Sequence, residues 1–227
     1  MFISCQVVIF FRVNMKYLNQ RNFSILMWFL FACGIFFHWF SFTRPIVIRL
    51  TDIFLLLMNA GVLFFLIQSS YDKKIALWLL VTVSLTYLAE LAGIHTGKIF
   101  GHYLYGNGMQ WKPAAVPIVI ALNWAVLILA SWSWARLITR KPLLEILAAI
   151  FLIVAFDLIL EPLAMKMDYW QWENGAIPVQ NYLAWAFIAG IFLLFLKSLK
   201  ISFDGKLLRQ YFLAQIIFFL LILFLIP

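Results

Sequence analysis

The chain has 227 residues, of which 66% are hydrophobic and only 11% are charged, and its mean hydropathy is +1.00. This composition excludes an ordinary soluble domain and is typical of a polytopic membrane protein. Lysine and arginine outnumber aspartate and glutamate by 17 to 9. Because basic residues beside membrane spans set topology, this excess is expected to reflect the lipid bilayer, and we expect no nucleic-acid partner.

The N-terminal segment, residues 1–22, is expected to lie in the cytoplasm. Its apolar run, Phe2 to Phe11, is shorter than the roughly 20 residues that span a bilayer. The run also lacks a small-residue cleavage site, so it does not resemble a secretory signal. The stretch that begins at Met15 is typical of a natural start. Residues 1–14 would then be an upstream extension, and we assign them no function.

Seven apolar runs follow, and each is long enough to cross a bilayer. They cover residues 23–42, 46–68, 75–95, 115–137, 143–165, 181–199 and 209–226. The sequence therefore predicts an all-α fold, a polytopic transmembrane bundle of about seven spans that forms a single domain over residues 23–227.

The basic residues between these spans predict the orientation. If the N-terminus is cytoplasmic, 12 of the 17 basic residues lie on the inner side: Arg12, Lys16, Arg21, Lys73, Lys74, Arg136, Arg140, Lys141, Lys197, Lys200, Lys206 and Arg209. Only Arg44, Arg49, Lys98, Lys112 and Lys166 remain outside. This distribution favours a multi-pass protein of the cell membrane, inner or plasma, with its N-terminus inside.

Two carboxylates lie in the fifth span, in the sequence Asp157-Leu-Ile-Leu-Glu161-Pro162. Residues four apart share one face of a helix. Pro162 has no N–H to give to the carbonyl of Leu158, which leaves a further polar group beside the acids. Ionisable groups at membrane depth usually face a polar interior. The pair could be a purely structural contact between helices, but further polar residues reach the same depth.

Counting residues from the ends of the spans places acids and amides from several helices in the outer third of the membrane. Besides Asp157, these are Glu90 in the third span, Asp52 in the second, and Asn123 with Trp124 in the fourth. A cluster of carboxylates in a medium of low dielectric is expected to keep a proton. A protonated, buried carboxylic acid can act as a general acid.

Two outer loops are rich in glycine and aromatic residues. One contains Tyr103 and Tyr105 and the other contains Trp170 and Trp172. Each loop follows a helix that carries a glutamate and precedes a proline, an asparagine and a tryptophan: Pro117, Asn123 and Trp124, then Pro178, Asn181 and Trp185. This pattern indicates an internal two-helix repeat, in which spans three and four correspond to spans five and six. The loop aromatics could equally form an interfacial belt.

Three histidines, His38, His95 and His102, raise the question of a metal or haem. They show no HExxH pattern and no Cys/His cluster, and P-loop, dinucleotide and nucleophile-elbow motifs are missing from the sequence. We expect neither a metal nor an organic cofactor.

Several of these segments together resemble the integral-membrane carotenoid hydratase family, which includes the carotenoid 1,2-hydratases and the bisanhydrobacterioruberin hydratases. The resemblance covers about residues 50 to 200. It rests on Glu90-Leu-Ala-Gly, Gly97-Lys-Ile-Phe-Gly-His-Tyr-Leu-Tyr, Pro117 with Asn123-Trp124, Asp157-Leu-Ile-Leu-Glu-Pro-Leu-Ala, and Trp170-Gln-Trp through Pro178-Val-Gln-Asn-Tyr.

The resemblance implies a carotenoid biosynthesis enzyme that adds water to the terminal C1–C2 double bond of an acyclic carotenoid end, giving a tertiary alcohol. The implied substrate is an acyclic or monocyclic carotenoid such as lycopene or γ-carotene, and other membrane enzymes of the pathway would be partners. The reaction needs an acid to protonate the alkene, aromatic faces can stabilise the resulting cation, and no redox cofactor takes part.

The role assignments are our own hypothesis. The candidate catalytic residues are Asp157, Glu161, Glu90 and Asp52. Asp157 would donate the proton, and Glu161 and Glu90 would position water or reload the donor. The candidate substrate-binding residues are Asn123, Trp124, Tyr103, Tyr105, Trp170, Trp172, Asn181 and Trp185.

Two rival interpretations remain. A lycopene-cyclase-like enzyme would also protonate an isoprenoid end but would capture the cation with another double bond. A carotenoid-binding or transport protein would use the acids to relay protons or to fix helices. The inner halves of the spans are almost wholly apolar, which favours a one-sided pocket over a transport path.

Overall fold

The computed structural model describes residues 19–70 and 72–225, so the expected upstream extension, residues 1–14, lies outside the described residues. In the described part the chain forms eight α-helices and one two-stranded sheet. Seven of these helices are long and apolar enough to cross a membrane: α2 (Gln20–Trp39), α4 (Thr51–Ser69), α5 (Lys74–Thr96), α6 (Ile118–Ile138), α7 (Pro142–Lys166), α8 (Val179–Ser198) and α9 (Lys206–Leu225). The prediction of a helical bundle with seven spans is confirmed.

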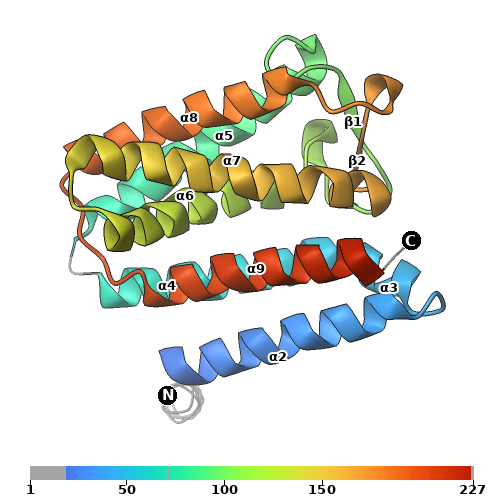
Figure 1. Ribbon diagram of the computed structural model, residues 1–227, viewed down its shortest axis with the longest axis horizontal. Coiled ribbons are helices and arrows are strands. Elements are labelled where there is room, and N and C mark those ends of the chain that lie inside the picture. Colours follow the sequence, from blue (N-terminus) through green and yellow to red (C-terminus); the bar gives the residue numbers. More distant parts are fainter. Residues whose placement is uncertain (1–18, 71, 226–227) are drawn as a thin grey trace, which may run out of the picture.

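The long helices lie roughly side by side along the long axis of the molecule (Figure 1). Helices α5 to α8 form one group, and α2, α4 and α9 form a second group beside it (Figure 1). Helix α6 is at the centre, packed against α4, α5, α7, α8 and α9. Some 83% of its most apolar stretch is buried, compared with 22% for α2 and 44% for α9. The remaining helices carry large apolar side chains on their outer faces, as a multi-pass membrane protein requires.

Local sequence signals determine several helix ends. The side chain of Asn19 accepts a hydrogen bond from the backbone N–H of Asn22 at 2.8 Å and caps α2. Pro117 and Pro178 occupy the N-cap positions of α6 and α8. Gly97 ends α5 in the left-handed conformation, with φ at 63°. Pro162 does not end α7, which continues to Lys166.

The second span differs from its predicted start at residue 46. A separate short helix, α3 (Arg44–Arg49), precedes α4, and Leu50 joins the two. The Thr51 hydroxyl forms hydrogen bonds with the carbonyl of Val47 at 3.2 Å and with the hydroxyl of Tyr169 at 3.0 Å. Asp52 consequently lies in the first turn of α4 rather than six residues inside a span.

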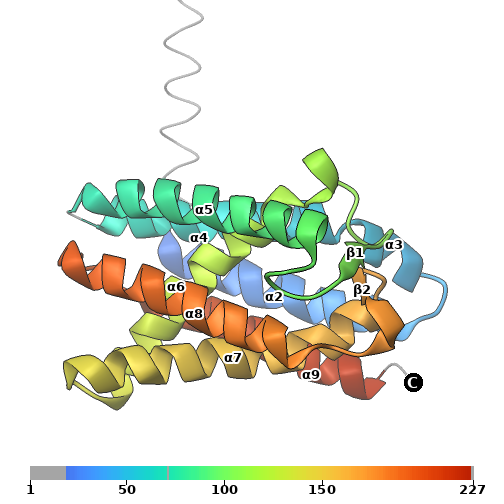
Figure 2. The ribbon, with the colours of Figure 1, turned by 90° about the horizontal axis from the view of Figure 1, so that it is seen from above.

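A small antiparallel sheet, which the sequence analysis did not predict, joins the two aromatic loops at one end of the bundle (Figure 2). Strands β1 (Tyr103–Tyr105) and β2 (Trp170–Trp172) pair so that Tyr103 lies opposite Trp172 and Tyr105 lies opposite Trp170. Gly106 directly after β1 allows this approach, because a Cβ there would meet the backbone and side chain of Asp168. We call this end of the molecule the strand end.

Candidate active site

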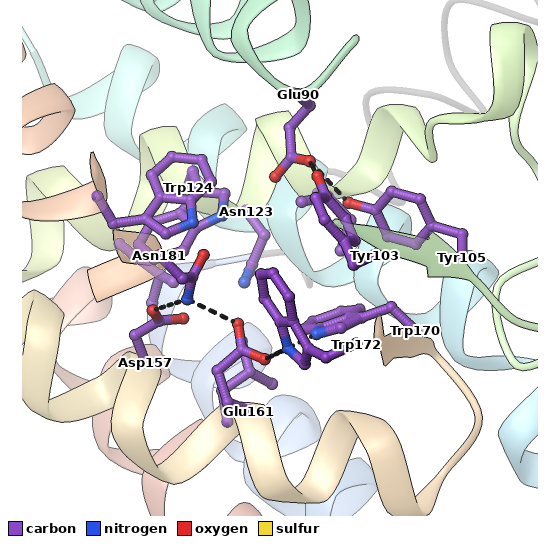
Figure 3. Close-up of a pocket in the computed structure, with 14 residues that line it drawn as sticks. Glu90, Tyr103, Tyr105, Asn123, Trp124, Asp157, Glu161, Trp170, Trp172 and Asn181 are labelled. Atoms are coloured by element: carbon purple, nitrogen blue, oxygen red, sulfur yellow. Dashed lines mark hydrogen bonds between the residues drawn. The ribbon is translucent and has the colours of Figure 1, made fainter. Parts of the chain in front are cut away.

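A small enclosed cavity lies between α5, α6, α7 and α8 at the strand end (Figure 3). Its volume is about 30 Å³, enough for roughly one or two water molecules. Eleven of the twelve candidate residues line this one cavity: Glu90, Tyr103, Tyr105, Asn123, Trp124, Asp157, Glu161, Trp170, Trp172, Asn181 and Trp185. The fold therefore brings together side chains from four helices and both strands. We call this space the acidic cavity.

Asn181 of α8 connects the two carboxylates of α7. Its side-chain amide donates one hydrogen bond to Asp157 Oδ2 at 2.9 Å and one to Glu161 Oε1 at 3.0 Å. Asp157 and Glu161 lie one helical turn apart on the same face, as their spacing of four residues predicts. Asp157 is 1% exposed and Glu161 is 3% exposed. The pair is thus held together inside the protein by a single neutral donor.

Glu161 is also held by the two indoles of β2. Trp170 Nε1 donates to Glu161 Oε2 at 2.8 Å, and Trp172 Nε1 donates to the same oxygen at 2.6 Å. With the amide of Asn181, Glu161 accepts three hydrogen bonds. Hydrogen bonds of this kind stabilise an ionised carboxylate. Within the described part of the chain, Asp157 accepts one hydrogen bond, from Asn181.

Glu90 of α5 faces the same cavity and is held by the two phenols of β1. The hydroxyls of Tyr103 and Tyr105 both donate to Glu90 Oε2, the second at 3.1 Å. Burial raises the pKa of Tyr103 and that of Tyr105 well above the ordinary tyrosine range, and the neighbouring Glu90 carboxylate raises them further. Both phenols therefore stay protonated and remain donors to Glu90.

The two halves of the site correspond to each other. In each half a glutamate accepts hydrogen bonds from two aromatic side chains that occupy alternate positions of the following strand: Tyr103 and Tyr105 for Glu90, and Trp170 and Trp172 for Glu161. A short 3₁₀ turn and an N-cap proline follow in both halves. Trp124 and Trp185 each come seven residues after that proline and stack on each other. This geometry supports the internal repeat that the sequence pattern indicated.

The stacked tryptophans are not equivalent. Trp185 stacks on Trp124 with ring centroids 3.8 Å apart, and also on Phe100 with centroids 5.0 Å apart. Because two aromatic partners cover the ring of Trp185, less of its face is left for a ligand than at Trp124.

Asp52 lies apart from the other candidates. Its Oδ2 accepts the backbone N–H groups of Gln110 and Trp111, at 2.6 and 2.8 Å. It is not among the residues that line the acidic cavity. Asp52 was expected to share the depth of the other acids, but it does not join them in the cavity. The break at Leu50 places Asp52 at the start of α4, where it holds the loop between β1 and α6.

Sequence reasoning missed several contributors to this region. Ile120, Leu127 and Leu160 form the apolar part of the cavity wall. Tyr211 of α9 donates a hydrogen bond to Asn123 Oδ1 at 3.4 Å. Apolar residues inside apolar helices leave no distinguishing signal, but a tyrosine within the seventh span could have been noticed. Within residues 19–70 and 72–225, no three His, Cys, Asp or Glu side chains are grouped as metal ligands.

Comparison with known proteins places the chain in a family. Residues 51–226 match the family described as carotenoid biosynthesis protein. A segment of 125 residues is 29% identical to the bisanhydrobacterioruberin hydratase of Haloarcula japonica, and the match covers 50% of this chain. The match spans 42% of that relative, so this chain covers less than half of its length. No solved structure matches the chain. The extent of the family match shows that the chain belongs to the carotenoid biosynthesis protein family and is a multi-pass membrane protein with a role in carotenoid biosynthesis.

Proposed function

We propose that this protein is a carotenoid 1,2-hydratase, which adds water to the terminal C1–C2 double bond of an acyclic carotenoid end group. The observation that carries the proposal is the acidic cavity, in which three buried carboxylates and four indole rings surround room for about one or two waters. The named relative, a bisanhydrobacterioruberin hydratase, supports the same reaction class.

The reaction needs an acid strong enough to protonate an unactivated alkene. Transfer of a proton to C-2 leaves a tertiary cation at C-1, and the oxygen of a water molecule then bonds to C-1. Loss of one proton from that oxygen gives the tertiary alcohol and restores the proton that the acid gave up. The net reaction is the addition of one water molecule to the alkene. A general acid and a general base within one water-sized space satisfy this requirement.

Asp157 is our candidate for the general acid. It is almost fully buried and accepts a single hydrogen bond, from the Asn181 amide. Glu161 accepts three and Glu90 accepts two. Among the three carboxylates Asp157 therefore has the least support for a negative charge, which favours its neutral, proton-donating form.

Glu161 and Glu90 are our candidates for handling the water. Their hydrogen bonds from Trp170, Trp172, Tyr103 and Tyr105 hold both carboxylates toward the cavity. A water between them can lose its proton to a carboxylate as its oxygen bonds to C-1. Asn181 donates a hydrogen bond to both Glu161 and Asp157. A proton that Glu161 takes from water would therefore lie close to Asp157, the donor to which the proton must return.

The aromatic walls suit a short-lived cation. Trp124, Trp170 and Trp172 line the space, and the electron-rich face of an indole attracts a positive charge within about 6 Å of the ring. Ile120, Leu127 and Leu160 add an apolar part to the wall, and the small volume of the cavity limits the water that would compete for the donated proton.

The basic residues support a cytoplasmic N-terminus in the cell membrane. Among the described residues, the strand end carries Arg44, Arg49, Lys98, Lys112 and Lys166, and the ten basic side chains from Arg21 to Arg209 that were assigned to the inner side lie at the other end. By the positive-inside rule, the strand end and the acidic cavity would face the outer side.

The direct test is expression of the gene in a host that accumulates lycopene, followed by mass analysis of the pigments. Hydration adds the mass of one water to each reacted end. A product of unchanged mass would instead indicate cyclisation, and unchanged lycopene beside correctly inserted protein would contradict both enzymatic interpretations.

A further inference from the structure

A second, larger cavity lies directly beside the acidic one. It has a volume of about 430 Å³ and is bounded mainly by α2, α4 and α9. Four residues form part of the wall of both cavities: Ile120, Asn123, Leu160 and Trp170. One layer of side chains therefore separates the apolar space from the carboxylates. We call this larger space the apolar cavity.

The apolar cavity reaches the lipid-facing surface between α2 and α4. Its wall includes Ile53, Leu57 and Phe37, which are 54%, 60% and 41% exposed. Toward the opposite end of the bundle the same two helices are closed against each other. There the ring of Phe23 fills the position that a side chain on Gly61 would occupy. The opening between the two helices thus lies in the half of the bundle that holds the acidic cavity.

Two buried polar side chains, Gln215 and His38, form part of the otherwise mainly apolar wall. The amide of Gln215 on α9 is 0% exposed, and His38 on α2 is 4% exposed. Within the described part of the chain, neither the Gln215 amide nor His38 Nε2 has a hydrogen-bond partner. Buried polar atoms without a protein partner are usually satisfied by water. We expect water beside Gln215 and His38, and the apolar side chains of the wall to contact the hydrocarbon chain.

We propose that the apolar cavity is the channel for the polyene chain of the carotenoid and that the substrate enters from the bilayer between α2 and α4. This inference rests on the proposed function, because the end group would reach Asp157 when side chains of the shared wall move aside. The lining residues of α2 run from Leu30 to His38, a length of about 12 Å at the helical rise. The channel is thus much shorter than the roughly 30 Å of bilayer hydrocarbon, so the remainder of the chain would stay in the lipid.

Helix α2 gives the channel a feature of its own. The family match begins at residue 51, so α2 and α3 contribute wall residues from outside the matched range. Side chains of α2 such as Leu30, Cys33 and Phe37 would therefore set how bulky an isoprenoid chain can enter.

The first test fills the channel. Cys33 lines the apolar cavity, whereas its neighbour Ala32 is exposed on the outer face of α2. Cys33→Trp and Ala32→Trp would each be made in an Asp157→Asn background and purified from a lycopene-producing host. Lycopene retained per protein is expected to fall about five-fold or more for Cys33→Trp, because an indole there would occupy part of the channel that the polyene needs, and to stay unchanged for Ala32→Trp. Equal retention by the two variants would overturn the channel.

The second test needs no bulky side chain and guards against misfolding of the first variant. In a Cys5→Ser protein, Cys33 is the remaining thiol, and its alkylation by a membrane-permeant maleimide would be timed in vesicles with and without lycopene. Lycopene is expected to slow the reaction about five-fold or more if it fills the cavity. A control thiol at position 32, from Ala32→Cys combined with Cys33→Ala, should react at the same rate in vesicles with lycopene and in vesicles without it.

The outcomes separate this inference from the hydratase proposal. If lycopene protects Cys33 but no hydrated pigment forms, the channel stands and the hydratase proposal fails. If hydrated pigment forms while Cys33 reacts equally fast with and without lycopene, the channel is overturned and the hydratase proposal stands.

Discussion

The indole rings of Trp124 and Trp185 stack with their centroids 3.8 Å apart and their planes 15° apart. The two residues come from helices α6 and α8, which begin after the two strands and belong to the two halves of the internal repeat. The stack therefore lies where the halves meet, beside the three carboxylates. It is both a packing contact and a wall of the acidic cavity.

Because the two rings are packed differently, we expect substitution of Trp124 to affect activity and substitution of Trp185 to affect stability. Trp124→Leu should lower hydration about ten-fold per folded protein, because the loss of a cation–π contact of about 0.5–2 kcal/mol slows the step that forms the cation. Trp185→Leu should mainly lower the melting temperature, because its ring packs on Phe100 and Trp124. Hydrated product per folded protein, measured beside thermal melting in detergent, distinguishes the two. Equal losses of turnover would show that Trp124 has no special role.

Asn181 should be needed for turnover, because it donates to both Asp157 and Glu161. Asn181→Leu removes two hydrogen bonds to carboxylates, each worth about 1.5–3 kcal/mol, and should reduce hydration by about 100-fold. Its sequence neighbour Gln180, which binds the carbonyls of Lys98 and Ile99 instead, provides the control. Gln180→Leu should retain hydration within about three-fold. An active Asn181→Leu protein would mean that the amide bridge is dispensable.

Asp52 should matter for stability and not for chemistry. Its Oδ2 accepts the N–H groups of Gln110 and Trp111, so Asp52→Ala should lower the free energy of unfolding by about 3 kcal/mol. Asp52→Asn keeps an accepting oxygen and should retain most of the hydration activity. Unfolding midpoints and pigment analysis of both variants check this expectation. Loss of hydration in a stably folded Asp52→Asn protein would instead return Asp52 to the catalytic group.

Tyr169 should make stability depend on alkaline pH. Burial raises the pKa of Tyr169 to about 12, while the hydrogen bond with Thr51 acts in the opposite direction. Its contribution to folding stability is complete below the ordinary tyrosine pKa of about 10 and is lost as the pH rises through the folded value of about 12. The melting-temperature advantage of the unmodified protein over Tyr169→Phe should therefore shrink between about pH 10 and about pH 12. A constant difference across this range would contradict the assignment.

Much of the fold could be predicted from the sequence, because length and apolarity alone define spans of this kind. Eleven of the twelve candidate residues line one cavity, and Asp52 does not. For Asp157 and Glu161 the spacing of four residues predicts the shared face. The pairing of β1 with β2 was not predicted. The alternating aromatics of Tyr103-Leu104-Tyr105 and Trp170-Gln171-Trp172 were its only local sign, and three residues are too few for a strand signal.

The position of Asp52 could not be predicted from depth counting for a different reason. Counting assumes one continuous helix, and the short helix α3 with the break at Leu50 changes where Asp52 lies. The apolar cavity was equally hidden, because its walls come from helices far apart in sequence, and their apolar side chains look like any other membrane-facing residues.

In the proposed reaction Asp157 gives its proton to the carotenoid alkene. Asp157→Asn keeps the shape of the side chain and an oxygen that can accept from Asn181, and Glu145→Gln, in the first turn of the same helix, is a matched control outside the acidic cavity. In a lycopene-producing host with equal amounts of inserted protein, hydrated pigment should fall about 100-fold or more for Asp157→Asn and stay unchanged for Glu145→Gln. Normal amounts of hydrated product from Asp157→Asn would show that Asp157 is not the proton donor.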